Sequence, residues 1–316
     1  MKKGFSNKKL GYVFTACLIT FLSFFKSKAT QSFNNYKFIF QTNNLIDSTN
    51  RESKIINSVV FAATTSSYFG LYQLWYKKYP QSSFHFFNDL EEWNYMDKVG
   101  HVYSSYQIAR KSHLFLKNKG INKPLEKGVI YSLTYMIGIE FLDGFSEQWG
   151  FSNYDLLSNF LGTGIYFFQE KKYRKQFIKF KFSSHQSNYA EMRPSLLGSN
   201  ELQSIFKDYN GQTYWITFDF NNKLQNNNKV LKYLDLSVGY SIDGFLGARN
   251  NNISNCGKCN EIKRQSQLLL SVDLDLSTIK TKNRFLKLIL NSFSIIKFPA
   301  PTLILQKQSQ FKWLYF

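Results

Sequence analysis

The chain has 316 residues, enough for two domains or one large one, and 18% of them are aromatic, including 32 Phe and 20 Tyr. Aromatic residues at this level are typical of membrane interfaces and of β-rich domains. The net charge of +19 fits nucleic acid, anionic lipid or acidic protein as a partner. No zinc-finger spacing, RNP-like motif or glycine-rich phosphate loop is present, so we expect no nucleic-acid partner.

Residues 1–29 are predicted to form a signal peptide that directs export. A lysine-rich start precedes an apolar stretch at 12–25, and Ser27-Lys28-Ala29 supplies the small residues that cleavage requires. A retained membrane anchor is the alternative. Lipidation at Cys17 is disfavoured because an aromatic residue stands three positions before it and the apolar stretch continues past it. Residues 30–52 are polar and are predicted to be a linker.

Four helices are predicted next, over roughly 53–77, 96–118, 124–143 and 152–170, because apolar residues recur there at helical spacing or in long blocks. The first is near the minimum length for a bilayer span, so a buried helix and a membrane helix both stay open. Pro124 suits the first turn of the third helix. Ser152 suits the N-cap of the fourth, with Asp155 three residues later.

Alternating and β-branched residues predict an antiparallel β domain over 176–316. The clearest strands are 213–220, 234–240, 268–276 and the aromatic end at 311–316, and an amphipathic helix is predicted at 282–295. The end resembles that of outer-membrane barrel proteins, so a sheet packed on the helices and a partial barrel both stay open. The predicted fold class is therefore α+β, with a helical domain at 53–175 whose membrane association is left open.

Charged and polar residues recur in pairs inside the aromatic helices, and their spacing of three or four places each pair on one helix face. Burying such groups unpaired costs on the order of several kcal/mol, so they must contact one another, water or a ligand. A histidine beside an acid can act as a general base, and clustered carboxylates raise one another's pKa. The candidate catalytic residues are Asp97, His101, Glu140, Asp143, Asp155 and Asn159.

Two other interpretations of these residues stay open. They can form a buried network that fixes helix packing, with Glu140 bonded to His101 or Asn159, or they can bind a ligand or lipid. No cofactor is expected, and no metal either, because the Glu-x-x-His pattern of di-iron bundles is missing. No Gly-x-Ser-x-Gly elbow is present. The remaining histidines His85, His113 and His185 are predicted to be surface residues.

Two further sites are predicted outside these helices' polar faces. A basic run gives candidates for contact with anionic lipid headgroups, with an ordinary solvated face as the alternative. Two cysteines outside the leader predict a local disulfide across a turn, with free thiols or a metal or redox site as alternatives. The residues are Lys171, Lys172, Arg174 and Lys175 for the basic run, and Cys256 and Cys259 for the disulfide.

Between about residues 85 and 170 the chain resembles the YfiM-like family, predicted periplasmic lipoproteins that form a domain of unknown function. The same order of motifs is more loosely similar to VanZ-like membrane proteins. Residues 207–215 and 297–302 look like the C-terminal extension of longer Bacteroidetes-type members. The motifs are Asp97-Lys98-x-x-His101, Glu140-x-x-Asp143-Gly144-Phe145, and Trp149-Gly150-Phe151-Ser152 followed by Asp155, Asn159 and Gly162.

The resemblance implies an envelope location and supplies no reaction. We expect an exported cell-envelope protein, periplasmic or outer-membrane associated, that is non-enzymatic and binds lipid or another envelope component or has a structural role. The alternative is a membrane-associated hydrolase or transferase that uses a buried cluster of one histidine and several carboxylates. A cleft lined by His101, Glu140 and Asp155 would favour chemistry, and a sealed cluster would favour a structural role.

Overall fold

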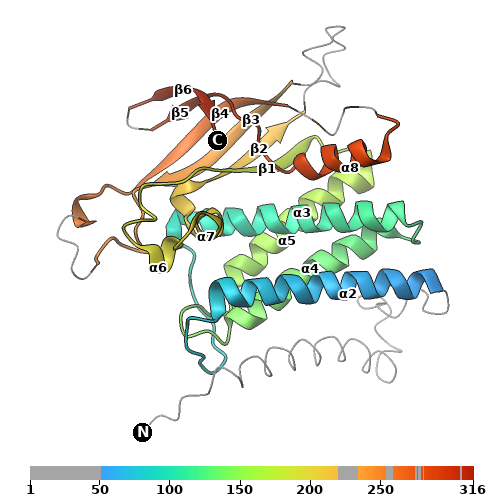
Figure 1. Ribbon diagram of the computed structural model, residues 1–316, viewed down its shortest axis with the longest axis horizontal. Coiled ribbons are helices and arrows are strands. Elements are labelled where there is room, and N and C mark those ends of the chain that lie inside the picture. The colour runs from blue at the N-terminus through green and yellow to red at the C-terminus, as the bar shows by residue number, and fades with distance from the viewer. Residues whose placement is uncertain are drawn as a thin grey trace.

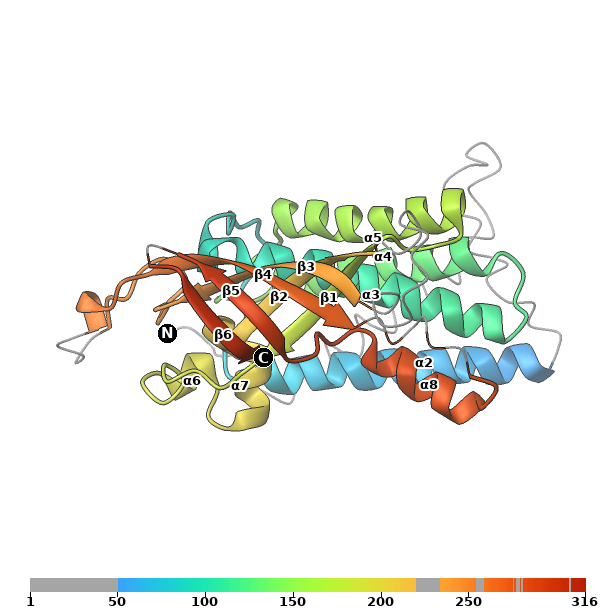
Figure 2. The ribbon, with the colours of Figure 1, turned by 90° about the horizontal axis from the view of Figure 1, so that it is seen from above.

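The computed structural model describes residues 51–219, 234–253, 259–274, 276, 279, 281–306 and 308–316. The predicted signal peptide, nearly all of the predicted linker, and Cys256 lie outside these residues. The described chain forms a layer of long helices with an antiparallel sheet over one side of it (Figure 1, Figure 2). This arrangement confirms the predicted α+β fold class.

Long helices make up the first half of the described chain. The bounds predicted for the second and third helices are confirmed, and the fourth continues past its predicted end. Among the described residues, no helix combines the length and apolar character that crossing a bilayer requires. The elements are α2 (Arg51–Leu71), the π-helical turn η3 (Tyr72–Tyr76), the 3-10 turn η4 (Glu92–Tyr95), α3 (Met96–Asn118), α4 (Pro124–Asp143) and α5 (Asn153–Tyr173).

Local sequence explains where two of these helices begin. The Ser152 hydroxyl accepts a hydrogen bond from the Asp155 amide at 3.1 Å, which caps α5 as predicted. Pro124 lies in the first turn of α4, where its missing N–H leaves no hydrogen bond unmade.

α3 is the central element and contacts α4, α5 and the sheet. Glycine permits the closest of these contacts, because a Cβ on Gly162 of α5 would lie 2.1 Å from the carbonyl oxygen of Val102 on α3. One turn farther along α3, Tyr106 packs with Tyr166 of α5 and with Phe180 of the sheet. The helical layer and the sheet therefore share one core around α3.

The second half forms one antiparallel sheet of six strands, in which every strand pairs with its neighbours along the chain. Each predicted strand and the predicted helix near 282–295 is confirmed, whereas β1 and β5 are additional. The strands are β1 (Ile178–Ser184), β2 (Gln212–Phe218), β3 (Leu234–Asp243), β4 (Gln265–Leu274), β5 (Ala300–Leu305) and β6 (Gln310–Tyr315). The connections hold α6 (Pro194–Leu197), α7 (Glu201–Lys207), η5 (Tyr209–Gly211), η7 (Cys259–Glu261) and α8 (Arg284–Phe293).

One face of the sheet is apolar and partly uncovered. At β1 and β2 this face packs on α3 through Phe180 and Tyr214. Farther along the sheet the same face carries Ile216, Leu236 and Val272, which are 38%, 44% and 42% exposed. Only part of the apolar face is therefore covered by helix.

The opposite, polar face of the sheet is buried because the sheet curls over it. Lys181 of β1 forms an ion pair with Asp273 of β4, and Tyr315 of β6 hydrogen-bonds to Thr213 of β2 at 3.0 Å. All four residues are buried. Charges and hydroxyls thus point to the inside of the curl, where they lie beside a buried apolar cluster of Trp215, Leu269, Ile304 and Tyr315.

A segment after α8 covers the outer edge of β1. The Phe182 amide donates to the Ile295 carbonyl at 3.0 Å, and the Lys297 amide donates to the Phe182 carbonyl at 2.8 Å. β1 is therefore paired on both sides, although its two partners are far apart in sequence.

Candidate functional site

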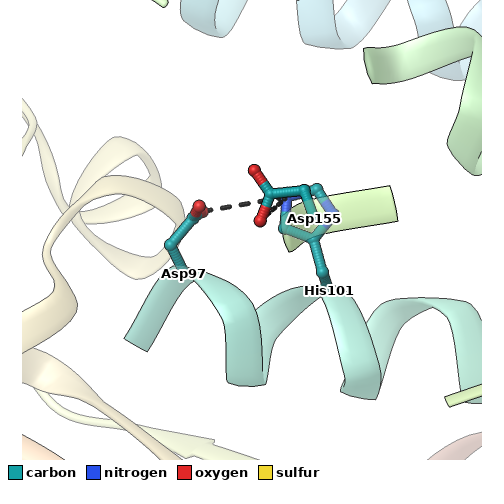
Figure 3. Close-up of side chains that lie close together, drawn as sticks. All are labelled: Asp97, His101 and Asp155. Carbon is teal, nitrogen blue, oxygen red and sulfur yellow. Dashed lines mark ion pairs between the residues drawn. The ribbon is translucent and has the colours of Figure 1, made fainter. Parts of the chain in front are cut away.

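Three helices bring most of the predicted polar residues together. Asp97 and His101 lie on α3, Glu140 on α4, and Asp155 and Asn159 on α5. Figure 3 shows Asp97, His101 and Asp155 gathered between the helices, with their polar atoms facing one another. The polar cluster comprises Asp89, Asp97, Lys98, His101, Glu140, Asp155 and Asn159.

Lys98 is the buried cation of the polar cluster. Its Nζ lies 2.6 Å from Asp155 Oδ1, 2.8 Å from Asp97 Oδ2 and 2.8 Å from Asp89 Oδ2. Burial alone would lower the pKa of Lys98, but the Asp97 and Asp155 carboxylates raise it overall. The ammonium group is therefore charged and joins α3, α5 and the segment before α3.

His101 lies between two sets of oxygen atoms. Its Nδ1 is 3.1 Å from Asn159 Oδ1 and 3.3 Å from Glu140 Oε1. Its Nε2 is 3.8 Å from Asp97 Oδ1 and 3.7 Å from Asp155 Oδ1. Burial lowers the pKa of His101, but the Glu140 and Asp97 carboxylates raise it overall. The distances on the Nδ1 side are closer to those of hydrogen bonds than the distances on the Nε2 side.

Carboxyl groups outnumber cations in the polar cluster. Lys98 and His101 face Asp89, Asp97, Glu140 and Asp155. Glu140 is 1% exposed, and burial raises the pKa of its carboxyl to about 9. Its Oε2 has no hydrogen-bond partner among the described residues. Burial also raises the pKa of the Asp155 carboxyl to about 10, so the folded cluster holds protons on part of its carboxyl groups.

Asp143 lies apart from the polar cluster. Its Oδ1 accepts a hydrogen bond from the Tyr76 hydroxyl at 2.6 Å, and burial raises the pKa of this carboxyl to about 7. Glu140 and Asp143 share a helix as predicted, but only Glu140 contacts His101.

Some residues that contact the polar cluster lie outside the predicted helix faces and were not foreseen from the sequence. Asp89 lies before α3 and accepts a hydrogen bond from Ser152 at 2.6 Å, so the α5 cap also contacts the polar cluster. Tyr209 comes from the second half of the chain and donates to Asp97 Oδ1 at 2.8 Å. Ser152 carried a local signal as a helix cap. No periodicity or motif links Asp89 or Tyr209 to the cluster.

The polar cluster is nearly closed. The side chains of Glu140, Asp155 and Lys98 are 1%, 6% and 9% exposed, whereas those of His101 and Asp97 keep 15% and 24%. A hollow of about 670 Å³ lies elsewhere, lined by Glu91, Asn94, Phe245, Lys263, Arg264, Gln265 and Ser266. The cluster can therefore hold protons or a small cation.

The predicted basic run lies at the end of α5, and two of its members have acidic partners. Lys171 pairs with Glu126 at 2.8 Å, and Lys175 pairs with Asp219 at 2.7 Å. Lys172 and Arg174 are exposed. These two remain the best placed to meet an external anion.

The remaining predicted sites have different outcomes. Cys259 is buried and disulfide-bonded, while Cys256 lies outside the described residues, so their pairing stays a prediction. The prediction that His113 is a surface residue is wrong. It is 3% exposed because α4 lies against its backbone at Gly128, and its Nδ1 is 2.6 Å from the Tyr166 hydroxyl. His185 is exposed as predicted, and His85 is partly buried.

The helical segment around the polar cluster has a counterpart among known families. Residues 85–171 match the family described as predicted periplasmic lipoprotein (DUF2279). The match contains every member of the polar cluster and stops before the sheet. It agrees with the predicted envelope location, while outer-membrane association and the narrower YfiM-like and VanZ-like resemblances stay predictions. No curated protein and no solved structure matches the chain.

Proposed function

We propose that this chain is a non-enzymatic envelope protein that lies peripherally on an anionic membrane surface. The observation that carries the proposal is the outer face of α5. From Tyr154 to Phe168, every exposed residue of this helix is aromatic, aliphatic or glycine. Leu157, Leu161 and Phe168 are 66%, 55% and 65% exposed. A helix that presents such a face and ends in basic residues is typical of interfacial membrane helices.

The α5 face is accessible from one side of the molecule. α5 packs on α3 and α4 and forms an outer flank of the helical layer (Figure 2). The face passes from Leu157 near the start of the helix to Phe168 near its end, and Lys172 and Arg174 follow at once. Apolar burial and attraction to headgroups can therefore act together along one helix.

The end of the bundle next to the basic run is strongly basic as a whole. α3 ends, α4 begins and α5 ends there, as the contact between Lys171 and Glu126 requires. Each basic side chain near an anionic bilayer contributes about 1 kcal/mol of attraction. This basic end comprises Lys117, Lys119, Lys123, Lys127, Lys171, Lys172, Arg174 and Lys175, with Glu126 and Glu170 as the acidic residues of the same segments.

The closed polar cluster supports the non-enzymatic part of the proposal. Lys98 links the segment before α3 to α3 and α5, and His101 with Asn159 links α3 to α5. Burying such groups fixes their relative positions, because each misplaced partner leaves a charge unpaired. The cluster thus supports the α5 face by holding its helix in place.

Co-sedimentation of the purified full chain with vesicles tests the apolar part of the proposal. We expect the double variant Leu157→Gln, Phe168→Gln to lower partitioning into anionic vesicles roughly tenfold or more, since each side chain loses its apolar contact with lipid. The control is Leu202→Gln, Phe285→Gln, whose residues are 64% and 70% exposed elsewhere. Equal partitioning of the wild type and the α5 variant would overturn the proposal.

The electrostatic part of the proposed membrane binding is tested on the same vesicles. We expect Lys172→Gln, Arg174→Gln to weaken binding to anionic vesicles several-fold and to leave binding to zwitterionic vesicles unchanged, because only the first carries the matching charge. The exposed pair Lys77 and Lys78 supplies the control substitutions. If the Lys172/Arg174 variant and the Lys77/Lys78 control lose equal affinity for anionic vesicles, the effect is one of net charge. That result would count against a basic end that faces the membrane.

A further inference from the structure

The close neighbours of His101 Nε2 are too far away for hydrogen bonds. Asp97 Oδ1 and Asp155 Oδ1 lie 3.8 Å and 3.7 Å from it. We propose that Asp97, His101 and Asp155 bind a divalent transition-metal ion of the Zn²⁺ type. The ion would tie α3 to α5 inside the helical domain.

The distances fit an ion placed between the three side chains. One ligand atom from each of Asp97, His101 and Asp155 lies within 4.8 Å of the others. Zn²⁺ binds imidazole nitrogen and carboxylate oxygen at about 2.0–2.2 Å, so two of its tetrahedral ligands lie roughly 3.4 Å apart. The separations of 3.8 Å and 3.7 Å at His101 therefore need only a small inward movement, and Figure 3 shows the three side chains facing one another.

The other side of the imidazole sets the tautomer that a metal ligand needs. Asn159 Oδ1 and Glu140 Oε1 both lie on Nδ1, and both are acceptors, so the ring N–H belongs there. In the neutral ring the Nε2 lone pair then points toward Asp97 and Asp155. A carboxylate behind a histidine is the usual support for a metal-bound imidazole, because it orients the ring and increases its basicity.

Glu140 is a second observation at this histidine, because it is a buried carboxyl with one oxygen left without a hydrogen-bond partner among the described residues. It is 1% exposed, and the oxygen without a partner there is Oε2. Lys98 does not reach it, since the contacts of the Lys98 ammonium are with Asp89, Asp97 and Asp155. A dication on His101 Nε2 would polarise the Nδ1–H toward Glu140 and favour the ionised form of this buried carboxyl.

Lys98 does not exclude the ion. It contacts Asp97 through Oδ2 and leaves Oδ1, the oxygen nearer His101, to the Tyr209 hydroxyl and the metal. Asp155 Oδ1 would be shared between the ammonium group and the ion. Because Asp97 and His101 keep some exposure, an ion can enter from their side.

The ligand types select the metal. One imidazole nitrogen and two carboxylate oxygens suit Zn²⁺ and its first-row neighbours, whereas Ca²⁺ takes six to eight oxygen ligands. No thiolate is present to select Cu(I). Three protein ligands leave at least one position for water.

The proposal is tested by titrating the purified full chain with ZnCl₂ after removal of metal by a chelator. We expect one equivalent to bind and the melting temperature to rise. Asp97→Asn and His101→Gln should each lower the affinity at least tenfold, and Glu140→Gln should lower it about 10–100-fold, because it removes the support of the imidazole. The exposed His185 supplies the control variant His185→Gln, which should bind as the wild type does.

Absorption spectroscopy with Co²⁺ distinguishes a specific site from nonspecific binding at the surface. Co²⁺ should give the visible absorption bands of a four- or five-coordinate nitrogen and oxygen site in the wild type and lose them in Asp97→Asn. This variant keeps the side-chain shape, and circular dichroism reports whether it folds, so it decides the question even where His101→Gln does not fold. Wild-type chain that binds no Zn²⁺, or binding that survives both ligand substitutions, would overturn the proposal.

Discussion

Asp143 accepts a hydrogen bond from the Tyr76 hydroxyl, whereas Asp97 and Asp155 also contact the Lys98 ammonium group. Burial raises the pKa of the Asp143 carboxyl to about 7, against about 3.9 in an unfolded chain. The folded protein therefore holds this proton more tightly, and the contribution of Asp143 to folding stability falls as the pH rises from about 4 to about 7.

We expect Asp143→Asn to remove this loss, because an amide keeps the oxygen that Tyr76 contacts and never ionises. The variant should match the wild type near pH 4 and exceed it above pH 7 by on the order of 4 kcal/mol. Urea unfolding across this range measures the difference. A difference that stays constant with pH would contradict a buried carboxyl with a raised pKa.

Single residues also show how far the site could be foreseen. The nearness of Asp97 to His101 followed from helical spacing, which fixes neighbours within a helix, whereas the contact of His101 with Glu140 on another helix was one of the open alternatives. The bond from Lys98 to Asp155 crosses between helices, and Tyr209 reaches Asp97 from the other half of the chain. Such contacts depend on tertiary packing, which no local pattern contains.

At the scale of elements, the contact between α3 and α5 depends on one small residue. A Cβ on Gly162 would lie 2.1 Å from the Val102 carbonyl oxygen and 2.3 Å from Ser105 Oγ, whereas a Cβ on Gly164 meets nothing within 4 Å. The two glycines lie on the same helix but on opposite sides of it with respect to α3.

Alanine at these two positions should act in opposite directions. We expect Gly162→Ala to destabilise the protein by about 1–3 kcal/mol or more, because overpacking forces the helices apart. We expect Gly164→Ala to stabilise it by about 0.5–1 kcal/mol through helix propensity. Thermal unfolding of both variants checks the pair. Equal effects would mean that α5 does not approach α3 through Gly162.

The elements that were predicted correctly have strong local signals, and those that were not have conflicting ones. α4 has proline at its start and an Asp-Gly end, so its bounds were predictable. β1 follows directly after the basic run, and its Lys179 and Lys181, which alternate with phenylalanine, weaken the strand pattern. β5 contains Pro301, which weakens a strand pattern. Lys181 is buried only because Asp273, far along the chain, lies beside it.

At the scale of the whole molecule, the sheet buries charges and exposes apolar side chains. Asp273 is 0% exposed and pairs with Lys181, and Lys297 lies 3.9 Å from it. On the outer face Leu236 is 44% exposed. The stability of this half therefore depends on the inner charges more than on the outer leucine.

We expect Asp273→Asn to cost about 3–5 kcal/mol of folding stability, because it leaves two buried ammonium groups without their carboxylate. Leu236→Thr should change the folding stability by about 0.5 kcal/mol, as substitutions at exposed positions do. Chemical denaturation of both variants measures the contrast. A larger loss from Leu236→Thr would mean that the outer face is covered within the folded chain.

The pairing of β1 imposes an order on folding. Strands β1 to β6 each pair with the strand just made, so the sheet can grow as the chain emerges, without waiting for distant partners. The outer side of β1 is different, because it stays open until residues 295–297 arrive. During that interval the nascent sheet carries an unpaired edge, the usual starting point for association between chains. A chain that stops short of residue 295 would keep that edge permanently.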